Sequence, residues 1–62
     1  MFVVEIDEIK GNESNRREYS HVQRKIAMRQ FESYKKWPEV VALSVIHRTR
    51  RLDTVVATWE RP

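Results

Sequence analysis

The stretch Val40–Ile46, VVALSVI, decides the fold because it is apolar on both faces of a strand. Side chains alternate along a strand, so this segment presents apolar groups to both sides of a sheet. One side receives Val40, Ala42 and Ile46 with Ser44, and the other receives Val41, Leu43 and Val45. A chain of 62 residues can cover one of these sides with its own helix and has little left for the other. The sequence therefore predicts a strand over 39–48 with one face made for a partner.

The length and composition allow one small domain over residues 1–62. A chain this short buries only about 60% of its unfolded surface, so its stability is marginal. It has no cysteine, which excludes disulfides and cysteine zinc sites as extra stabilisation. Its two histidines, His21 and His47, are too few for a closed metal site. We expect no metal and no cofactor, and we expect good local packing or association with another chain.

Two further strands are predicted from alternation. Residues 2–10 place Phe2, Val4 and Ile6 on one face and acidic side chains on the other, which is typical of a half-buried strand. Residues 53–59 also alternate, and residues 49–52 between the strands lack glycine and asparagine. That composition favours a loop of four or five residues over a two-residue hairpin.

Residues 16–36 are predicted to form one amphipathic helix. Its apolar face at helical spacing consists of Tyr19, Val22, Gln23, Ile26, Ala27, Gln30, Phe31 and Tyr34. Asn15 with Glu18 fits a capping box at its start, and Pro38 ends it. Arg16 and Arg17 in the first turn oppose the helix dipole, which indicates that these arginines are there for a contact.

The predicted fold class is α+β, with the order β-α-β-β: a three-stranded sheet with one amphipathic helix packed on one face. The strand order stays open. The two-sided hydrophobicity of 39–48 favours this strand in the middle, whereas a split arrangement places 53–59 there.

No pattern in the chain indicates catalysis. Glu5 and Asp7 share a strand face, but nothing predicts a pocket that would shift their pKa values. The chain has one glycine, so it has no glycine-rich phosphate loop. No apolar run approaches the roughly 20 residues of a membrane span, and no signal peptide is evident. We expect a non-enzymatic protein in the cytoplasm of a bacterial or virus-infected cell.

Charge is unevenly distributed along this basic chain, whose net charge is +3. Residues 1–13 hold four acids and one base, whereas residues 16–36 hold seven bases and two acids. A basic helix face beside an arginine-rich turn is able to follow phosphates. The candidate nucleic-acid contacts are Arg24, Lys25, Arg29, Arg48, Arg50 and Arg51.

Two binding functions follow. The leading hypothesis is a small protein-interaction module of bacterial or phage type, a homodimer that regulates or inhibits a larger protein. Its contact surface is predicted to consist of Val41, Leu43, Val45, Val56 and Trp59. The alternative is a basic nucleic-acid-binding protein that uses the helix bases and the arginine-rich turn.

Overall fold

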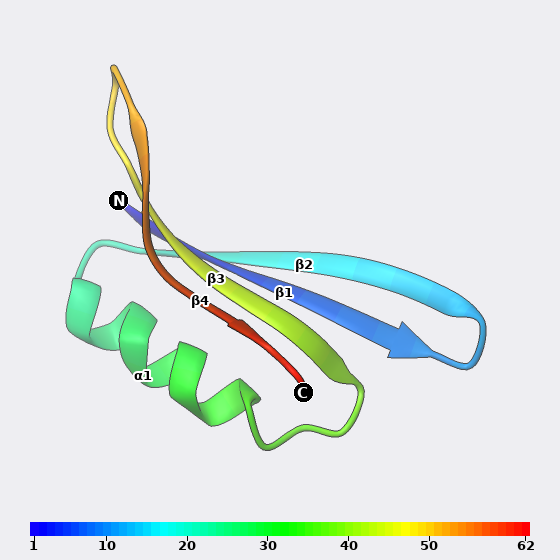
Figure 1. Cartoon of the computed structure of the whole chain (residues 1–62). Helices are drawn as coiled ribbons and strands as arrows, with labels where there is room; N and C mark the ends of the chain where they lie inside the picture. The colour runs from blue at the N-terminus through cyan, green and yellow to red at the C-terminus, as the bar shows by residue number, and fades with distance from the viewer.

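The protein forms a four-stranded antiparallel sheet with one short helix on one face, as a computed structural model that describes residues 1–62 shows (Figure 1). In chain order the elements are β1 (Phe2–Lys10), β2 (Glu13–His21), α1 (Arg24–Tyr34), β3 (Val40–Arg48) and β4 (Asp53–Glu60). The strand order in the sheet is β2-β1-β3-β4. The backbone of helix α1 lies close to β1, β3 and β2, whereas β4 lies farther from it. The prediction of a three-stranded β-α-β-β fold is therefore wrong. Only the broad α+β class agrees with the structure.

The strand that sequence analysis missed is β2. Residues 13–21 were expected to form a turn and the start of a helix, but they pair along their whole length with β1. Only Tyr19 and His21 in this strand carry sizeable ring surfaces, so no apolar alternation marks it. Cross-strand charges stabilise it instead, because Arg16 lies opposite Asp7 in the register. The helix consequently begins at Arg24 and not at residue 16.

A two-residue turn joins β1 to β2. Lys10 pairs with Glu13, which leaves Gly11 and Asn12 as the loop. Gly11 has a φ of 61°, and no residue other than glycine has a positive φ. This pattern fits a type II′ turn, whose first central position favours glycine.

The hydrophobic core lies between α1 and the central strands. Its members are Val4, Ile6, Ala27, Phe31, Val40, Leu43 and Val45, all at most 3% exposed. Helix α1 contributes only Ala27 and Phe31, so most of the core comes from β1 and β3. Burial of each larger side chain contributes about 1.5–3 kcal/mol.

An irregularity in the β1–β3 register decides which side chains of β3 face the helix. The register shifts between Asp7 and Glu8, so that Asp7 pairs with Ala42 and Glu8 with Val40. The extra residue is Val41, as in a β-bulge. The core therefore takes Val40 together with Leu43, although strict alternation placed these two residues on opposite faces.

The C-terminus fixes the connection between α1 and β3. The Arg61 guanidinium donates hydrogen bonds to the carbonyl oxygens of Lys35, Trp37 and Val40, at 3.2, 2.7 and 2.9 Å. The Arg61 backbone N–H also donates to the Val41 carbonyl, at 2.9 Å. These contacts tie the end of the helix to the sheet. Helix α1 has 11 residues and is neither long nor apolar enough to cross a membrane.

Candidate nucleic-acid interface

The five residues predicted to contact a protein partner do not form one surface. Leu43 and Val45 are 1% and 0% exposed because they lie beneath α1. Val41 is half-buried on the opposite face of the sheet, since the bulge turns it away from the helix. Val56 and Trp59 are half-buried on β4 and pack against the core. The burial of Leu43 and Val45 removes the centre of the predicted contact surface.

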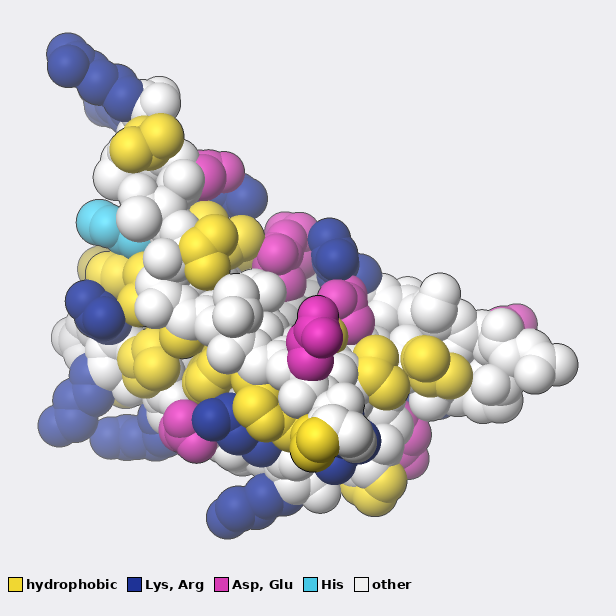
Figure 2. Space-filling model, viewed as in Figure 1, with side chains coloured by type: hydrophobic (Ala, Val, Ile, Leu, Met, Phe, Trp, Pro, Cys, Tyr) yellow, Lys and Arg dark blue, Asp and Glu magenta, His cyan; other side chains and the backbone are white.

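The uncovered face of the sheet is charged in the middle, as Figure 2 shows where magenta and dark blue side chains gather over the strands. Asp7 and Arg16 form a two-point ion pair there, with Arg16 Nε 2.7 Å from Asp7 Oδ1 and Nη2 3.3 Å from Oδ2. Glu5 lies 3.9 Å from the same guanidinium. The hydrogen bond and charge of Asp7 raise the pKa of Arg16. This face is not a continuous apolar patch.

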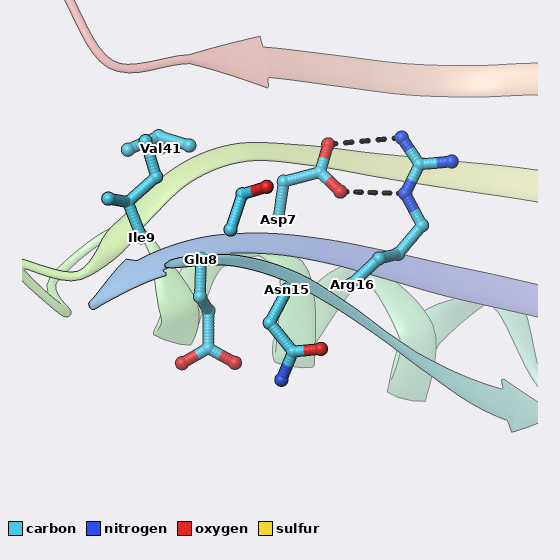
Figure 3. A pocket seen from close by; sticks show the side chains of 7 residues that line it. Asp7, Glu8, Ile9, Asn15, Arg16 and Val41 are labelled. Atoms are coloured by element: carbon cyan, nitrogen blue, oxygen red, sulfur yellow. Dashed lines mark hydrogen bonds and ion pairs between the residues drawn. The ribbon is translucent and has the colours of Figure 1, made fainter. Parts of the chain in front are cut away.

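A shallow hollow of about 420 Å³ lies beside this ion pair (Figure 3). Its lining residues are Asp7, Glu8, Ile9, Ser14, Asn15, Arg16 and Val41. Figure 3 shows Asp7 and Arg16 directed at each other, whereas Glu8 and Asn15 point to the helix side of the sheet. Both charged groups on the open side are thus engaged with each other.

A second ion pair anchors β2 beneath the helix. Glu8 is 4% exposed and accepts a hydrogen bond from Arg17 Nε. Arg17 also donates to the Tyr19 hydroxyl, at 3.2 Å, and its guanidinium lies 5.7 Å from the Tyr34 ring centroid. Burial lowers the pKa of Arg17, but the hydrogen bond and charge of Glu8 outweigh this effect and the net shift is upward. The expectation that Arg16 and Arg17 make contacts is correct, although they do so from a strand.

The cations of the chain fall into two groups. Of the twelve lysines and arginines, Arg16, Arg17, Lys35 and Arg48 form ion pairs with carboxylates, and Arg61 binds backbone carbonyls. The other seven make neither kind of contact. They are Lys10, Arg24, Lys25, Arg29, Lys36, Arg50 and Arg51.

Five of these seven free cations belong to α1 and to the β3–β4 turn, and Lys36 follows the end of α1. Figure 2 shows dark blue side chains at the tip of this hairpin, at upper left, and along the helix, at lower left and below. We name this group, Arg24, Lys25, Arg29, Lys36, Arg50 and Arg51, the basic side. Glu32 is the one acid in α1, and Lys35 already binds it at 2.9 Å. No free carboxylate of the helix offsets the basic side.

The β3–β4 turn is a fixed loop that displays its arginines. Thr49 and Leu52 bind each other through three hydrogen bonds: Thr49 N–H and Oγ1 donate to the Leu52 carbonyl, at 3.0 and 2.9 Å, and Leu52 N–H donates to Thr49 Oγ1, at 3.1 Å. The Arg48–Asp53 pair, at 3.3 Å, closes its base. Arg50 and Arg51 are exposed at the tip, which projects beyond the rest of the sheet (Figure 1). Arg48 itself is neutralised and is the weakest of the six predicted nucleic-acid contacts.

A hollow of about 440 Å³ lies between the start of the helix and the base of the hairpin. Its lining residues are Phe2, Arg24, His47, Thr54, Val55 and Val56. The rings of Phe2 and His47 stack within it, with centroids 4.5 Å apart. The hollow therefore brings Arg24 of α1 next to the arm that carries Arg50 and Arg51. The contact between Phe2 and His47 has no signal in the sequence, because only the β1–β3 register brings the two residues together.

The structure brings no three histidine, aspartate or glutamate side chains together in a group that could hold a metal ion. His21 binds Gln30, with 2.6 Å between Nε2 and Oε1, and His47 stacks on Phe2. Both histidines thus have packing roles.

Comparisons of the chain with protein-family models, with curated protein sequences and with solved structures yield no match.

Proposed function

We propose that this protein binds double-stranded nucleic acid through the basic side. The single observation that supports this proposal is the segregation of free cations. The lysines and arginines without a carboxylate partner lie on α1, just after its end at Lys36, and on the β3–β4 turn, with Lys10 as the one exception.

The chemistry of the basic side suits phosphates. Lysine and arginine side chains that contact the backbone of a duplex displace condensed counterions, and this release supplies most of the non-specific binding free energy. Six contacts predict that the logarithm of the affinity falls with the logarithm of salt concentration with a slope of about −5. Arginines at the tip of a narrow two-stranded arm also have the reach to enter a groove.

A duplex fits better than a single strand because the basic side lacks stacking platforms. Single-strand binders interleave exposed aromatic rings with their cations. Here Phe31 is 3% exposed, Phe2 stacks on His47, and Tyr34 packs against Tyr19, with ring centroids 6.4 Å apart. Trp37, 48% exposed, is the one large aromatic available near Lys36, which is too little for a continuous base-stacking surface.

The protein-interaction hypothesis loses support from the burial of Leu43 and Val45. Its remaining basis is the exposed edge of β4, which supports association of the chain with a second copy of itself.

The test is fluorescence anisotropy with a labelled DNA duplex and a labelled RNA duplex, between about 50 and 200 mM salt. We expect binding at low salt and a steep loss as salt rises. Replacing Arg50 and Arg51 together by alanine is expected to reduce the salt slope by about 2, and so is replacing Lys25 and Arg29 together. Lys10→Ala removes a free cation from the opposite hairpin and is expected to leave the slope unchanged.

Two outcomes would overturn the proposal. The first is the absence of binding to either duplex at the lowest salt concentration. The second is a Lys10→Ala variant that lowers the salt slope as much per removed charge as the joint replacement of Arg50 and Arg51 does. Net charge, and not the basic side, would then account for binding.

A further inference from the structure

We propose that the outer edge of β4 pairs in antiparallel orientation with the same edge of a second copy, so that the protein forms a twofold dimer. This inference stands independently of nucleic-acid binding. It rests on a difference between the two edge strands of the sheet, β2 and β4.

The edge of β4 carries one of the devices that keep strand edges apart, a bulge at Val56, and lacks the others. Between Asp53 and Glu60 it carries no charge and no proline, and Val55 is 61% exposed. Figure 1 shows no other element beside its outer edge, and the backbone of α1 lies closer to β1, β2 and β3 than to β4. An edge with free backbone N–H and C=O groups and apolar side chains is a template for another strand. The register between β3 and β4 shifts opposite Val45 and Ile46, and β4 bends there. Residues 56–60, after the bend, are therefore the part of β4 that runs along the edge of the sheet.

The edge of β2 is protected by comparison. Four of its nine residues are charged, namely Glu13, Arg16, Arg17 and Glu18. Charged side chains on an edge strand oppose the approach of another sheet. Because only one edge is open, pairing consumes it and stops at two copies. Pairing at the β4 edge therefore gives a dimer and not an open-ended assembly of chains.

The second half of β4 is complementary to itself. Ala57 and Trp59 pair with Val45 and Leu43, respectively, so both face the helix side. In an antiparallel pair centred on Thr58, the Trp59 of each copy lies opposite the Ala57 of the other, a large side chain against a small one. The two Thr58 side chains then lie opposite each other, a cross-strand pair that stabilises sheets. No like charges meet in the centre of this interface.

The symmetry has a consequence for the shape of the dimer. The twofold axis of an antiparallel strand pair is perpendicular to the sheet. Both helices then cover the same face of one continuous sheet, and the two basic sides are displayed in a single assembly.

The test uses the absence of cysteine from the chain. Thr58→Cys introduces a unique thiol at the proposed twofold axis, where directly opposed Cα atoms lie about 4.5–5.5 Å apart. That separation allows a disulfide. We expect mild oxidation to give a covalent dimer of Thr58→Cys. The matched control Ser20→Cys, at an exposed position of the β2 edge, is expected to stay monomeric in denaturing gels.

Sedimentation equilibrium of the cysteine-free protein at micromolar concentration provides the second readout. We expect twice the monomer mass for the wild type and for Ser20→Lys, and the monomer mass for Thr58→Lys, which places two charges opposite each other. A wild-type monomer overturns the proposal, and so does a dimer that persists in Thr58→Lys or that cross-links only through Ser20→Cys. Neither result depends on nucleic-acid binding, so the two proposals fail separately.

Discussion

The two hairpins of this sheet differ in whether their arginines are paired with carboxylates. In the β1–β2 hairpin, Arg16 and Arg17 reach across to Asp7 and Glu8, so each arginine is neutralised by the neighbouring strand. In the β3–β4 hairpin the strands are largely apolar, and the free arginines are confined to its tip. The first hairpin uses its cations to hold a polar strand in place, whereas the second presents them to the solvent.

This difference separates structural charges from charges available for binding. A high content of arginine does not by itself mark a binding surface, because a carboxylate on the adjacent strand can account for it. The free cations on α1 and on the turn have no carboxylate partner that would explain them in this way. Variants in either hairpin test this distinction.

The largest effect is expected from Arg17→Met. It leaves Glu8, 4% exposed, as a buried carboxylate without a partner, and this unpaired charge makes the loss of unfolding free energy the largest of the series, although water reaches the Arg17 side chain, which is 38% exposed. Urea denaturation measures the loss. The double variant Arg17→Met with Glu8→Leu removes both charges and is expected to recover most of the stability. A loss below about 1 kcal/mol for Arg17→Met would show that the pair does not anchor β2.

A smaller loss is expected from Gly11→Ala, of about 1–2 kcal/mol in unfolding free energy. The φ of 61° disfavours any residue with a Cβ atom, while nothing lies within 4 Å of the position where that atom would be. The cost therefore comes from the backbone alone. Gly11→Asn is the matched control and is expected to lose less, because asparagine tolerates the left-handed region better. Equal losses for the two variants in thermal denaturation would contradict this explanation.

Arg16→Met is expected to cost less than about 1 kcal/mol, although its ion pair has good geometry. The side chains of Arg16 and Asp7 are 58% and 35% exposed, so water screens the pair. Raising the salt concentration should shrink the difference from the wild type in urea denaturation. If Arg16→Met proved as damaging as Arg17→Met, burial would not be the factor that distinguishes the two pairs.

The smallest effect on stability is expected from the joint replacement of Arg50 and Arg51 by alanine. Neither side chain has a partner in the fold, so the unfolding free energy should stay within about 0.5 kcal/mol of the wild type. Thermal denaturation of the same preparation that enters the binding assay checks this expectation. A marked loss would show that the tip arginines stabilise the hairpin itself.

The candidate basic side could be predicted in part from the sequence. Arg24, Lys25 and Arg29 keep the helical spacing that places them on the outer face of α1, although the helix is shorter than expected. The exposed tip with Arg50 and Arg51 follows from a loop between two alternating segments. The pairing of Arg48 with Asp53 could not be predicted, because it depends on the register between two strands.

The sequence alone predicts β1, β3 and β4, because alternating or two-sided hydrophobicity is a local property of each segment. It also determined that a helix ends before Pro38. Only the tertiary structure decided that residues 13–21 form a strand, since this strand is stabilised by charges on its neighbour and not by its own pattern. The bulge that turns Val40 towards the helix was decided in the same way. Local periodicity encodes what one segment buries, whereas pairing between segments determines which face it buries and against what.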